Sequence, residues 1–392
     1  MLLANCNIVD VRNGLVLRSK SLRTSGNMIA DISDSKTTSE DYIDLKGLYI
    51  MPGLINVHAH LSMVWGKEGR MLNESPEITA YRAHNRARKA LLSGVTTIRT
   101  LGERYRVDFA LISAQKHGLI DGPRILAAGS AITTTGGHGV IFSGAVQADG
   151  PDEILKAVRE QLSSGADQIK LMVTGGLSDL GQTMNQMQMN PDEIRTAVHG
   201  AAERGAYVSA HVNSSESVVE AANCGVRCFE HCYQLEEYAA EKIKNIGGWL
   251  VPTLTVTRTP EWARQNGFED WEIERISSVA DRHLQSTRNA LEAGVLIANG
   301  TDQPPGDTAG GVNLTVREAE FLVEAGMTPL DAIRASTANG ARLCGIDKTV
   351  GNLEPGYVAD VIAVRSNPLE DIKALEKILF VVHDGHIVRS DF

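Results

Sequence analysis

GLINVHAHLS, at residues 53–62, places two histidines, His58 and His60, one residue apart at the end of an apolar run. An apolar run of this length, directly after Met51 and Pro52, is typical of a buried strand. Alternate residues of a strand share a face, so both imidazoles would point to the same side. Either they pack in the interior or they hold a ligand together, and the rest of the chain decides between the two.

Short apolar strands continue after this stretch and alternate with helical segments. We expect strands near residues 54–60, 95–101, 124–129, 168–174, 207–211, 226–231, 249–254 and 295–300. Helical stretches follow most of them, for example at 77–93, 152–164, 191–204 and 314–325. Strands that alternate with helices at this spacing predict an α/β fold, a (β/α)8 TIM barrel of parallel strands.

The two ends of the chain differ from the middle. Residues 5–19, NCNIVDVRNGLVLRS, alternate around an Asn-Gly turn, and residues 351–368, GNLEPGYVADVIAVRSNP, suggest strands joined by glycine turns. We expect residues 1–50 and 347–392 to pair into one small composite β-sandwich domain. Residues 51–346 would then form the barrel.

The composition narrows the class of protein. The chain of 392 residues is 43% hydrophobic and 22% charged, as in folded soluble proteins. Its formal net charge of −10 argues against nucleic acid and membrane surfaces as partners. The N-terminus lacks the pattern of a signal peptide, and the sequence has no apolar run of ~18 residues. Five cysteines without framework spacing are expected to be reduced, which favours a cytoplasmic location.

Polar side chains gather at the ends of the expected barrel strands, where the active sites of such barrels lie. The set comprises His58, His60, Lys170, His211, His231 and Asp302. Each alone has an ordinary explanation, such as a hydrogen-bonded core histidine, a lysine stem reaching solvent or a helix-capping aspartate. Together they favour a metal site, because imidazole and carboxylate are ligands that zinc prefers.

This set resembles the amidohydrolase superfamily, and the resemblance covers nearly the whole chain. The family pattern has H-x-H on the first strand, lysine on the fourth, histidines on the fifth and sixth and aspartate on the eighth, which correspond to the six residues above. The segments SGVTTIRTLG and GPRILAAGSAITTTGGHG resemble its imidazolonepropionase-like branch. That branch includes metal-dependent dipeptidases and carboxypeptidases.

The resemblance implies a binuclear centre, most simply with two zinc ions. In the dipeptidases the lysine carries CO2 as a carbamate whose two oxygens bridge the cations, so Lys170 would be carboxylated. The implied ligands of one ion are His58, His60 and Asp302, and those of the other are His211 and His231.

The resemblance also implies a mechanism. Two cations would activate a bridging water and polarise the carbonyl of the substrate. Asp302 would take the proton of that water and pass it to the leaving amine. His138, in TTGGHG, resembles the substrate-binding histidine of the family and would donate a hydrogen bond to the oxyanion.

Three further features bear on the substrate. The dipeptidase pattern has a tyrosine or histidine two residues after the fifth-strand ligand, whereas this chain has Asn213. Asn213 is a candidate to bind the substrate, since its amide can still donate a hydrogen bond, but its shorter reach points to an altered substrate. Arg258 is a candidate to pair with a substrate carboxylate. The segment 258–277 is long for a loop of a barrel and carries Trp262 and Trp271. It is either a lid or a helix docked on the barrel or on a second subunit.

We therefore expect a binuclear zinc-dependent hydrolase that cleaves an amide bond of a small-molecule substrate. A dipeptide or N-acyl amino acid is the leading substrate class. The alternative is a hydrolase of carbamates, phenylureas or aryl amides. A cyclic amidine deaminase ranks lower because Lys170 is present, and a non-catalytic scaffold ranks lower because the ligand set is whole. Barrels of this family often form dimers or rings, so we expect a homo-oligomer.

Overall fold

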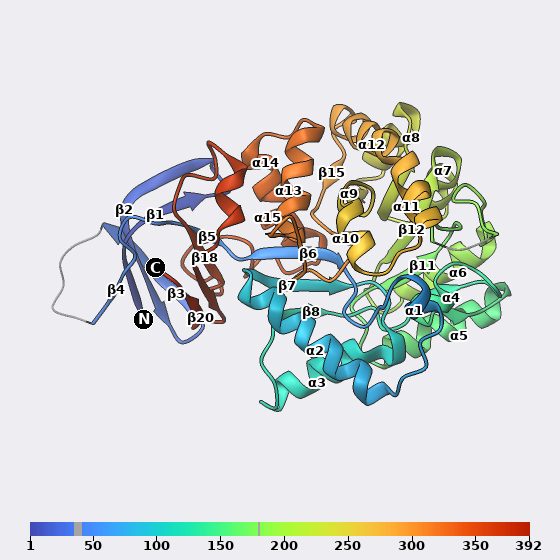
Figure 1. The fold of residues 1–392 in the computed structure, drawn as a ribbon, viewed down its shortest axis with the longest axis horizontal. Coiled ribbons are helices and arrows are strands. Elements are labelled where there is room, and N and C mark those ends of the chain that lie inside the picture. The colour runs from blue at the N-terminus through green and yellow to red at the C-terminus, as the bar shows by residue number, and fades with distance from the viewer. Residues whose placement is uncertain (35–40, 179–180) are drawn as a thin grey trace.

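The computed structural model describes residues 1–34, 41–178 and 181–392 and contains two parts (Figure 1). A barrel surrounded by helices occupies one end of the molecule, and a smaller β-sheet that contains both chain termini occupies the other. The prediction of an α/β barrel with an added β domain is confirmed.

The strands of the barrel are parallel and follow the order of the sequence. They are β6 (Leu54–Ala59), β7 (Val95–Thr100), β8 (Arg124–Leu126), β9 (Ile132–Thr133), β11 (Ile169–Met172), β12 (Val208–Ser214), β13 (Cys228–Gln234), β14 (Trp249–Val251) and β15 (Leu296–Ile297). Hydrogen bonds link β6–β7–β8 in one sheet and β9–β11–β12–β13–β14–β15 in another. The backbone N–H of Val57 donates to the carbonyl of Asn299 at 2.8 Å, which joins the last strand to the first.

The third strand of the barrel is broken in the middle. The sequence predicts one strand over 124–129, whereas the structure has β8 paired with β7 and β9 paired with β11. Gly129 lies at the break with a φ of 68°, and the side chain of Gln161 accepts a hydrogen bond from the N–H of Ser130. The two halves complete the barrel, and the second half leads into the loop that carries His138.

Helices cover the outside of the barrel (Figure 1). They are α1 (Gly66–Arg70), α2 (Pro76–Leu92), α3 (Val107–Lys116), α4 (Val140–Ser143), α5 (Gly150–Ser163), α6 (Pro191–Ala202), α7 (Ser215–Asn223), α8 (Glu237–Asn245), α9 (Leu254–Arg258), α10 (Pro260–Gln265), α11 (Asp270–Ser278), α12 (Ala280–Ala293), α13 (Leu314–Ala325), α14 (Pro329–Ala335) and α15 (Ala338–Leu343), with 3-10 turns η1 (Arg104–Arg106) and η2 (Ile372–Glu376). Short strands lie in the connections, namely β10 (Val146–Gln147), β16 (Thr308–Ala309) and β17 (Val312–Asn313). The predicted helices correspond to α2, α5, α6 and α13.

Both ends of the chain build the smaller sheet. Its strands are β1 (Leu2–Asp10), β2 (Leu15–Ser25), β3 (Met28–Asp34), β4 (Ile43–Asp44), β5 (Tyr49–Pro52), β18 (Val361–Val364), β19 (Phe380–His383) and β20 (His386–Ser390). Antiparallel pairing of β5 with β18 joins the two ends, and hydrogen bonds link the eight strands in one sheet. The composite domain is therefore confirmed. Its bounds, 1–50 with 347–392, and those of the barrel, 51–346, stay predictions.

Local capping places the strand ends of the barrel. Ser214 ends β12 and caps α7, because its hydroxyl accepts a hydrogen bond from the N–H of Ser217 in the first turn of that helix. Asn190 and Glu193 form a capping box at the start of α6. Because each helix begins at a defined residue, side chains near the strand ends, such as that of His211, stay at the mouth of the barrel.

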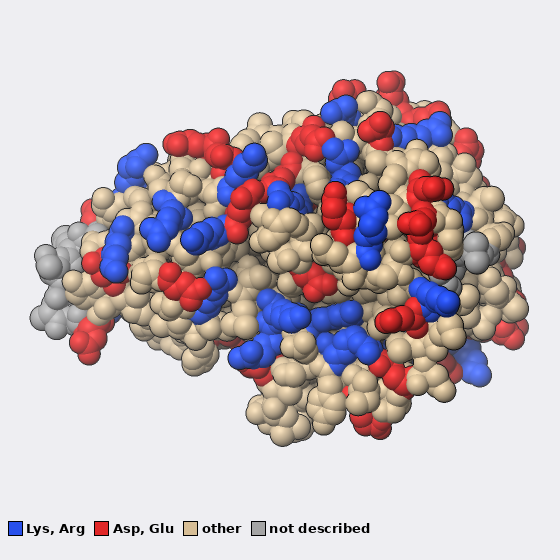
Figure 2. Space-filling model, viewed as in Figure 1, with Lys and Arg blue, Asp and Glu red and all other residues tan. Residues whose placement is uncertain are grey.

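Charged side chains of both signs alternate over the surface. Figure 2 shows a group of basic side chains over α2, a helix that contains Arg82, Arg86 and Arg88. Arg82 pairs with Glu74, and Arg88 lies 3.5 Å from Asp121. Among the described residues, no helix has the length and apolar character needed to cross a membrane. A cytoplasmic location, a homo-oligomeric state and the absence of nucleic-acid and membrane partners stay predictions.

Candidate metal centre

One cavity at the mouth of the barrel collects the side chains that the sequence singled out. Its lining includes His58, His60, His138, Lys170, His211, His231 and Asp302. The cavity has a volume of about 70 Å³, which is room for small ions and water between these groups. Residues up to 244 positions apart in the chain meet here, because parallel strands place their carboxyl ends at the same rim.

His58 on β6 and His60 just after it converge on one carboxylate. Oδ1 of Asp302 lies 3.0 Å from Nε2 of His58 and 3.0 Å from Nε2 of His60. Both imidazoles are buried, whereas the side chain of Asp302 is 26% exposed. Potential ligand atoms of His58, His231 and Asp302 all lie within 4.8 Å of one another, a spacing at which one metal ion could join them.

The second nitrogen of each imidazole has a fixed partner. Nδ1 of His58 is 2.7 Å from Oε2 of Glu230, and Nδ1 of His60 is 2.9 Å from the carbonyl of Gly102. Nδ1 of His231 is 2.8 Å from the hydroxyl of Thr253. These contacts leave Nε2 of each ring for the cavity, as outer partners do for metal-bound histidines.

In His211 the other ring nitrogen, Nε2, is the one that contacts the protein. Its Nε2 lies 3.2 Å from the carbonyl of Gly175 and 3.0 Å from the side-chain amide of Asn213. Nδ1 is therefore the nitrogen of His211 that is available to a metal. The four rings thus each offer one nitrogen, and the donor set is one that fits divalent zinc.

The backbone is unusual where these side chains leave their strands. His231 and Asp302 have φ values of 68° and 57°, in the left-handed region that non-glycine residues seldom adopt. Cys232 and Thr253 share this conformation. Strained residues of this kind gather at functional sites, where the surrounding structure holds them in place.

Lys170 lies buried among the histidines. Its side chain is 1% exposed, and its Nζ makes no hydrogen bond to any of the described residues. Burial lowers the pKa of Lys170, although Glu230 and Asp302 oppose the shift. A buried amine with no partner is costly unless another group joins it. The site therefore fits a modified lysine or a bound cation cluster better than it fits a free ammonium.

The pKa shifts of the other groups in the cavity suit metal ligands. Burial lowers the pKa of His231 and of His211 well below the usual range, so both are neutral, which is the form that binds metals. Burial alone would raise the pKa of Asp302, but its contacts with His58 and His60 hold it well below the usual range. For His60, burial opposes protonation, but contact with Asp302 raises the pKa.

His138 reaches the cavity from the loop after β9. Its ring lies 4.4 Å from the ring of His211, centroid to centroid, and its N–H donates to the side chain of Gln188 at 2.9 Å. A Cβ on Gly176 would lie 2.1 Å from the His138 ring, so a residue without a side chain is required there. The loop thus holds His138 beside the histidine cluster.

Two predicted substrate contacts are corrected by the structure. Asn213 does not line the cavity: its amide is buried behind His211 and donates to Thr174 and to the carbonyl of Gly175. Arg258 does not line it either, because it lies in α9, pairs with Glu324 and faces the ring of Phe321. Neither side chain is positioned to bind a substrate in the cavity.

The segment 258–277 docks on the mouth of the barrel as α10 and α11. Trp262 is 2% exposed, and its ring packs nearly perpendicular to that of Trp65, with the two ring centroids 5.4 Å apart. Trp65 lines the cavity. Of the two alternatives for this segment, the structure shows helices docked on the barrel. The segment supports one wall of the site.

Three buried side chains beside the site were missed by the sequence analysis. Glu230 and Arg99 form an ion pair at 2.8 Å beneath His58, and both are 0% exposed. The ring of Tyr233 stacks on that of His231 at 5.5 Å. Tyr233 follows His231 by two residues, a spacing that was available in the sequence. Arg99 was visible as a charge inside an apolar strand.

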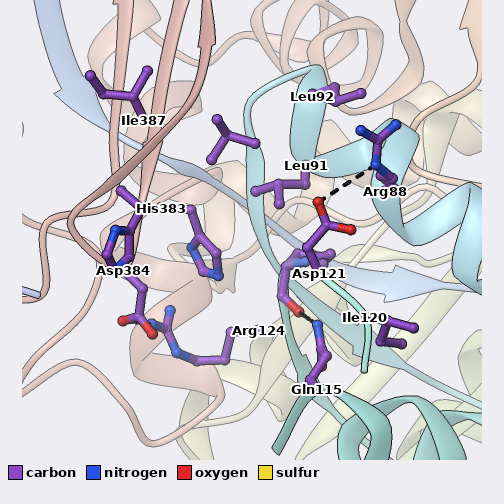
Figure 3. Close-up of a pocket in the computed structure, with 14 residues that line it drawn as sticks. Arg88, Leu91, Leu92, Gln115, Ile120, Asp121, Arg124, His383, Asp384 and Ile387 are labelled. Carbon is purple, nitrogen blue, oxygen red and sulfur yellow. Dashed lines mark hydrogen bonds and ion pairs between the residues drawn. The ribbon is translucent and has the colours of Figure 1, made fainter. Parts of the chain in front are cut away.

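A second pocket lies away from this centre, between α2, the segment before β8 and the strands β19 and β20 (Figure 3). Its volume is about 520 Å³. Its charged groups pair with each other: Arg88 lies 3.5 Å from Asp121, and Arg124 lies 3.6 Å from Asp384. The pocket shares no residue with the histidine cluster.

The fold and the site define a hydrolase that acts on carbon–nitrogen bonds. The chain belongs to the amidohydrolase family, whose model matches residues 49–388. It is 32% identical to ochratoxinase of Aspergillus niger over 95% of this chain and 82% of that protein.

Solved structures agree with this assignment. A Xaa-Pro dipeptidase with methionine bound in its active site is 32% identical to this chain, with a TM-score of 0.88 over 99% of both chains. A prolidase complexed with N-methylphosphonate-L-proline is 27% identical, with a TM-score of 0.90 over 100% of this chain and 99% of that one.

Proposed function

We propose that this protein is a binuclear zinc-dependent hydrolase that cleaves the amide bond of a dipeptide or N-acyl amino acid. The observation that carries the proposal is the convergence of four histidines, Asp302 and Lys170 on one cavity, where the buried amine of Lys170 has no hydrogen-bond partner among the described residues. The similarity to a Xaa-Pro dipeptidase and to a prolidase supports the substrate class.

The chain offers ligands for two ions. His58, His60 and Asp302 would hold the first ion, and His211 and His231 would hold the second. Lys170, carboxylated by CO2, would bridge them, which would explain why its amine has no partner among the described residues. When bound, such a pair of cations lowers the pKa of a coordinated water and polarises a substrate carbonyl.

The protein residues would then orient the substrate and move a proton. Asp302 is the one partly exposed member of the ligand set, and its contacts with His58 and His60 hold its pKa low, so it is ionised and its carboxylate would be the group that accepts a proton from water. It would deliver that proton to the departing amine. His138 lies beside His211 on a loop with glycines on both sides of it. It would donate a hydrogen bond to the carbonyl oxygen of the substrate.

An apolar wall supports a second candidate substrate class. Met63, Trp65, Phe142 and Met172 line the same cavity as the histidines. Trp65 is fixed between the ring of Trp262 and the guanidinium of Arg86, which lies 5.4 Å from the centroid of the Trp65 ring. A wall of this kind suits an apolar or aromatic group beside the scissile bond. Aryl amides, phenylureas and carbamates are therefore the alternative substrates.

A substrate screen tests the proposal. Zinc-loaded protein would be incubated with dipeptides, N-acyl amino acids, aryl amides and aryl carbamates, and released amines would be identified by mass spectrometry. We expect release from dipeptides or N-acyl amino acids, and none from the Asp302→Asn variant. Release from aryl substrates alone would favour the second class, and no release from any carbonyl substrate would contradict the proposal.

A further inference from the structure

Glu230 occupies a special place beneath the histidine cluster. It lies on β13, one residue before His231, and its side chain is 0% exposed. A buried carboxylate is costly unless donors and an opposite charge surround it. The structure supplies both, and the way in which the two oxygens share the donors indicates what the residue does.

The two oxygens of Glu230 have different partners. Oε1 accepts from Arg99 at 2.8 Å, from the hydroxyl of Ser209 at 2.5 Å and from the thiol of Cys228 at 3.0 Å. Oε2 is paired with Nδ1 of His58 at 2.7 Å. One oxygen therefore anchors the carboxylate in the barrel, and the other is directed to His58.

Contact with an ionised carboxylate fixes the proton of the imidazole. A carboxylate only accepts hydrogen bonds, so Nδ1 of His58 must carry a proton, which leaves Nε2 as the nitrogen whose lone pair can bind a metal. Nε2 is the nitrogen that lies 3.0 Å from Asp302 in the cavity. His60 and His231 have a backbone carbonyl and a hydroxyl in the corresponding place, so among these rings His58 has the charged partner.

Arg99 keeps this carboxylate charged and in place. Its guanidinium is 0% exposed, and besides Glu230 it donates to the carbonyl of Val57 and to the hydroxyl of Tyr207 at 2.9 Å. Val57 directly precedes His58 on β6. Arg99 therefore ties Glu230 to the strand whose histidine Glu230 contacts, and the pair crosses the barrel from β7 to β13.

We propose that Glu230, held by Arg99, is a positioning residue that fixes the tautomer and direction of His58 for metal binding. The inference rests on the proposed metal site and adds a residue to it. A purely structural role, in which Glu230 only balances the charge of Arg99, makes a different prediction. It predicts that stability depends on Glu230 and that the metal affinity of the folded protein does not.

The test measures zinc affinity by competition with a chelating dye, with folding of each metal-free variant checked by circular dichroism. We expect Glu230→Gln to weaken the first zinc site by about 10- to 100-fold, the usual effect of losing an outer partner of a metal-bound histidine. Glu193→Gln is the matched control, because Glu193 is a buried glutamate that caps α6 away from the site. Its zinc affinity should equal that of the wild type.

Two further variants separate positioning from charge balance. The double variant Glu230→Gln with Arg99→Gln removes both charges, so it keeps the fold testable if the single variant is unstable. We expect its zinc affinity to remain low. In a His58→Ala background, Glu230→Gln should cause no additional loss, because the residue acts through His58.

The outcomes are distinct. Wild-type affinity in folded Glu230→Gln, or recovery of affinity in the double variant, would overturn the positioning role while leaving the metal site intact. A further loss in the His58→Ala background would also overturn it. If the wild type bound no zinc, the proposed function itself would fail.

Discussion

At the scale of single residues, the site depends on which nitrogen of each histidine is engaged elsewhere. Glu230, Gly102 and Thr253 engage Nδ1 of three rings, whereas Gly175 engages Nε2 of His211. The sequence predicts the histidines, because alternate residues of β6 share a face. It does not predict Glu230, since a regular strand would turn Glu230 and His231 to opposite faces. The left-handed backbone of His231 changes that alternation, and the residue types in this stretch do not predict a left-handed conformation.

His138 allows a prediction at this scale. In the proposed reaction it donates a hydrogen bond to the substrate and binds no metal, so His138→Gln should lower kcat/KM by about 100- to 1,000-fold. The zinc content should stay at the wild-type value. Metal analysis alongside kinetics checks this, with the exposed His117→Gln as control. Loss of zinc together with activity would identify His138 as a ligand instead.

At the scale of elements, two strands meet closely at a glycine, and two helices are joined by a carboxylate that caps one of them. Gly300, after β15, lies against β6: a Cβ there would lie 2.6 Å from Cβ of His58 and 2.8 Å from its backbone nitrogen. Glu318 on α13 accepts hydrogen bonds from the N–H groups of Leu254 and Thr255 at the start of α9. Helix and strand bounds follow from sequence patterns, but such contacts between distant elements depend on the assembled fold.

Gly300→Ala should separate β6 from β15. Because backbone atoms would have to move, we expect a loss of about 1–3 kcal/mol of stability and a lower thermal midpoint. Weaker zinc binding should accompany it, since His58 is the residue displaced. Gly122→Ala is the control, because there the added Cβ meets only the end of the Gln115 side chain. Equal midpoints for the two variants would contradict the close approach.

Glu318 gives a pH prediction. Burial raises its pKa from 4.5 to about 7, although hydrogen bonds from Thr255 and Leu254 oppose the shift. Between pH 4.5 and about 7, Glu318 therefore keeps its proton in the folded protein and loses it in the unfolded chain. The stability from this group is fully present below pH 4.5 and falls by on the order of 3 kcal/mol as the pH rises through 7.

Thermal midpoints of wild type and Glu318→Gln, measured from pH 4.5 to 8, check this sign. The wild type should lose stability relative to the variant as the pH rises, whereas the exposed Glu292→Gln should keep a constant difference from the wild type. A difference between wild type and Glu318→Gln that does not change with pH would show that Glu318 titrates normally in the folded protein.

At the scale of the whole molecule, the site joins strands from around the barrel. The candidate ligands come from β6, β11, β12, β13 and the segment after β15. The barrel was predictable because apolar strands and helices alternate along the sequence. The break between β8 and β9 was not, because Gly129 and Ser130 suggest the end of a strand, and the second half has only two residues, Ile132 and Thr133.

Metal removal should therefore affect the entire fold. A ligand bound only to the folded state stabilises it by about 4 kcal/mol at 1,000 times its Kd. We expect dialysis against a chelator to lower the thermal midpoint and added zinc to restore it. The His211→Ala variant should recover only in part. An unchanged midpoint after complete metal removal would contradict a centre that links these strands.

The most direct measurement counts zinc ions per chain and looks for a carbamate on Lys170. Protein loaded with zinc in ¹³C-labelled bicarbonate would be compared with Lys170→Ala by metal analysis, ¹³C NMR and amide hydrolysis. We expect two zinc ions and a carbamate signal in the wild type, with both the signal and the activity lost in the variant. One zinc ion, no carbamate signal and full activity in Lys170→Ala would contradict it.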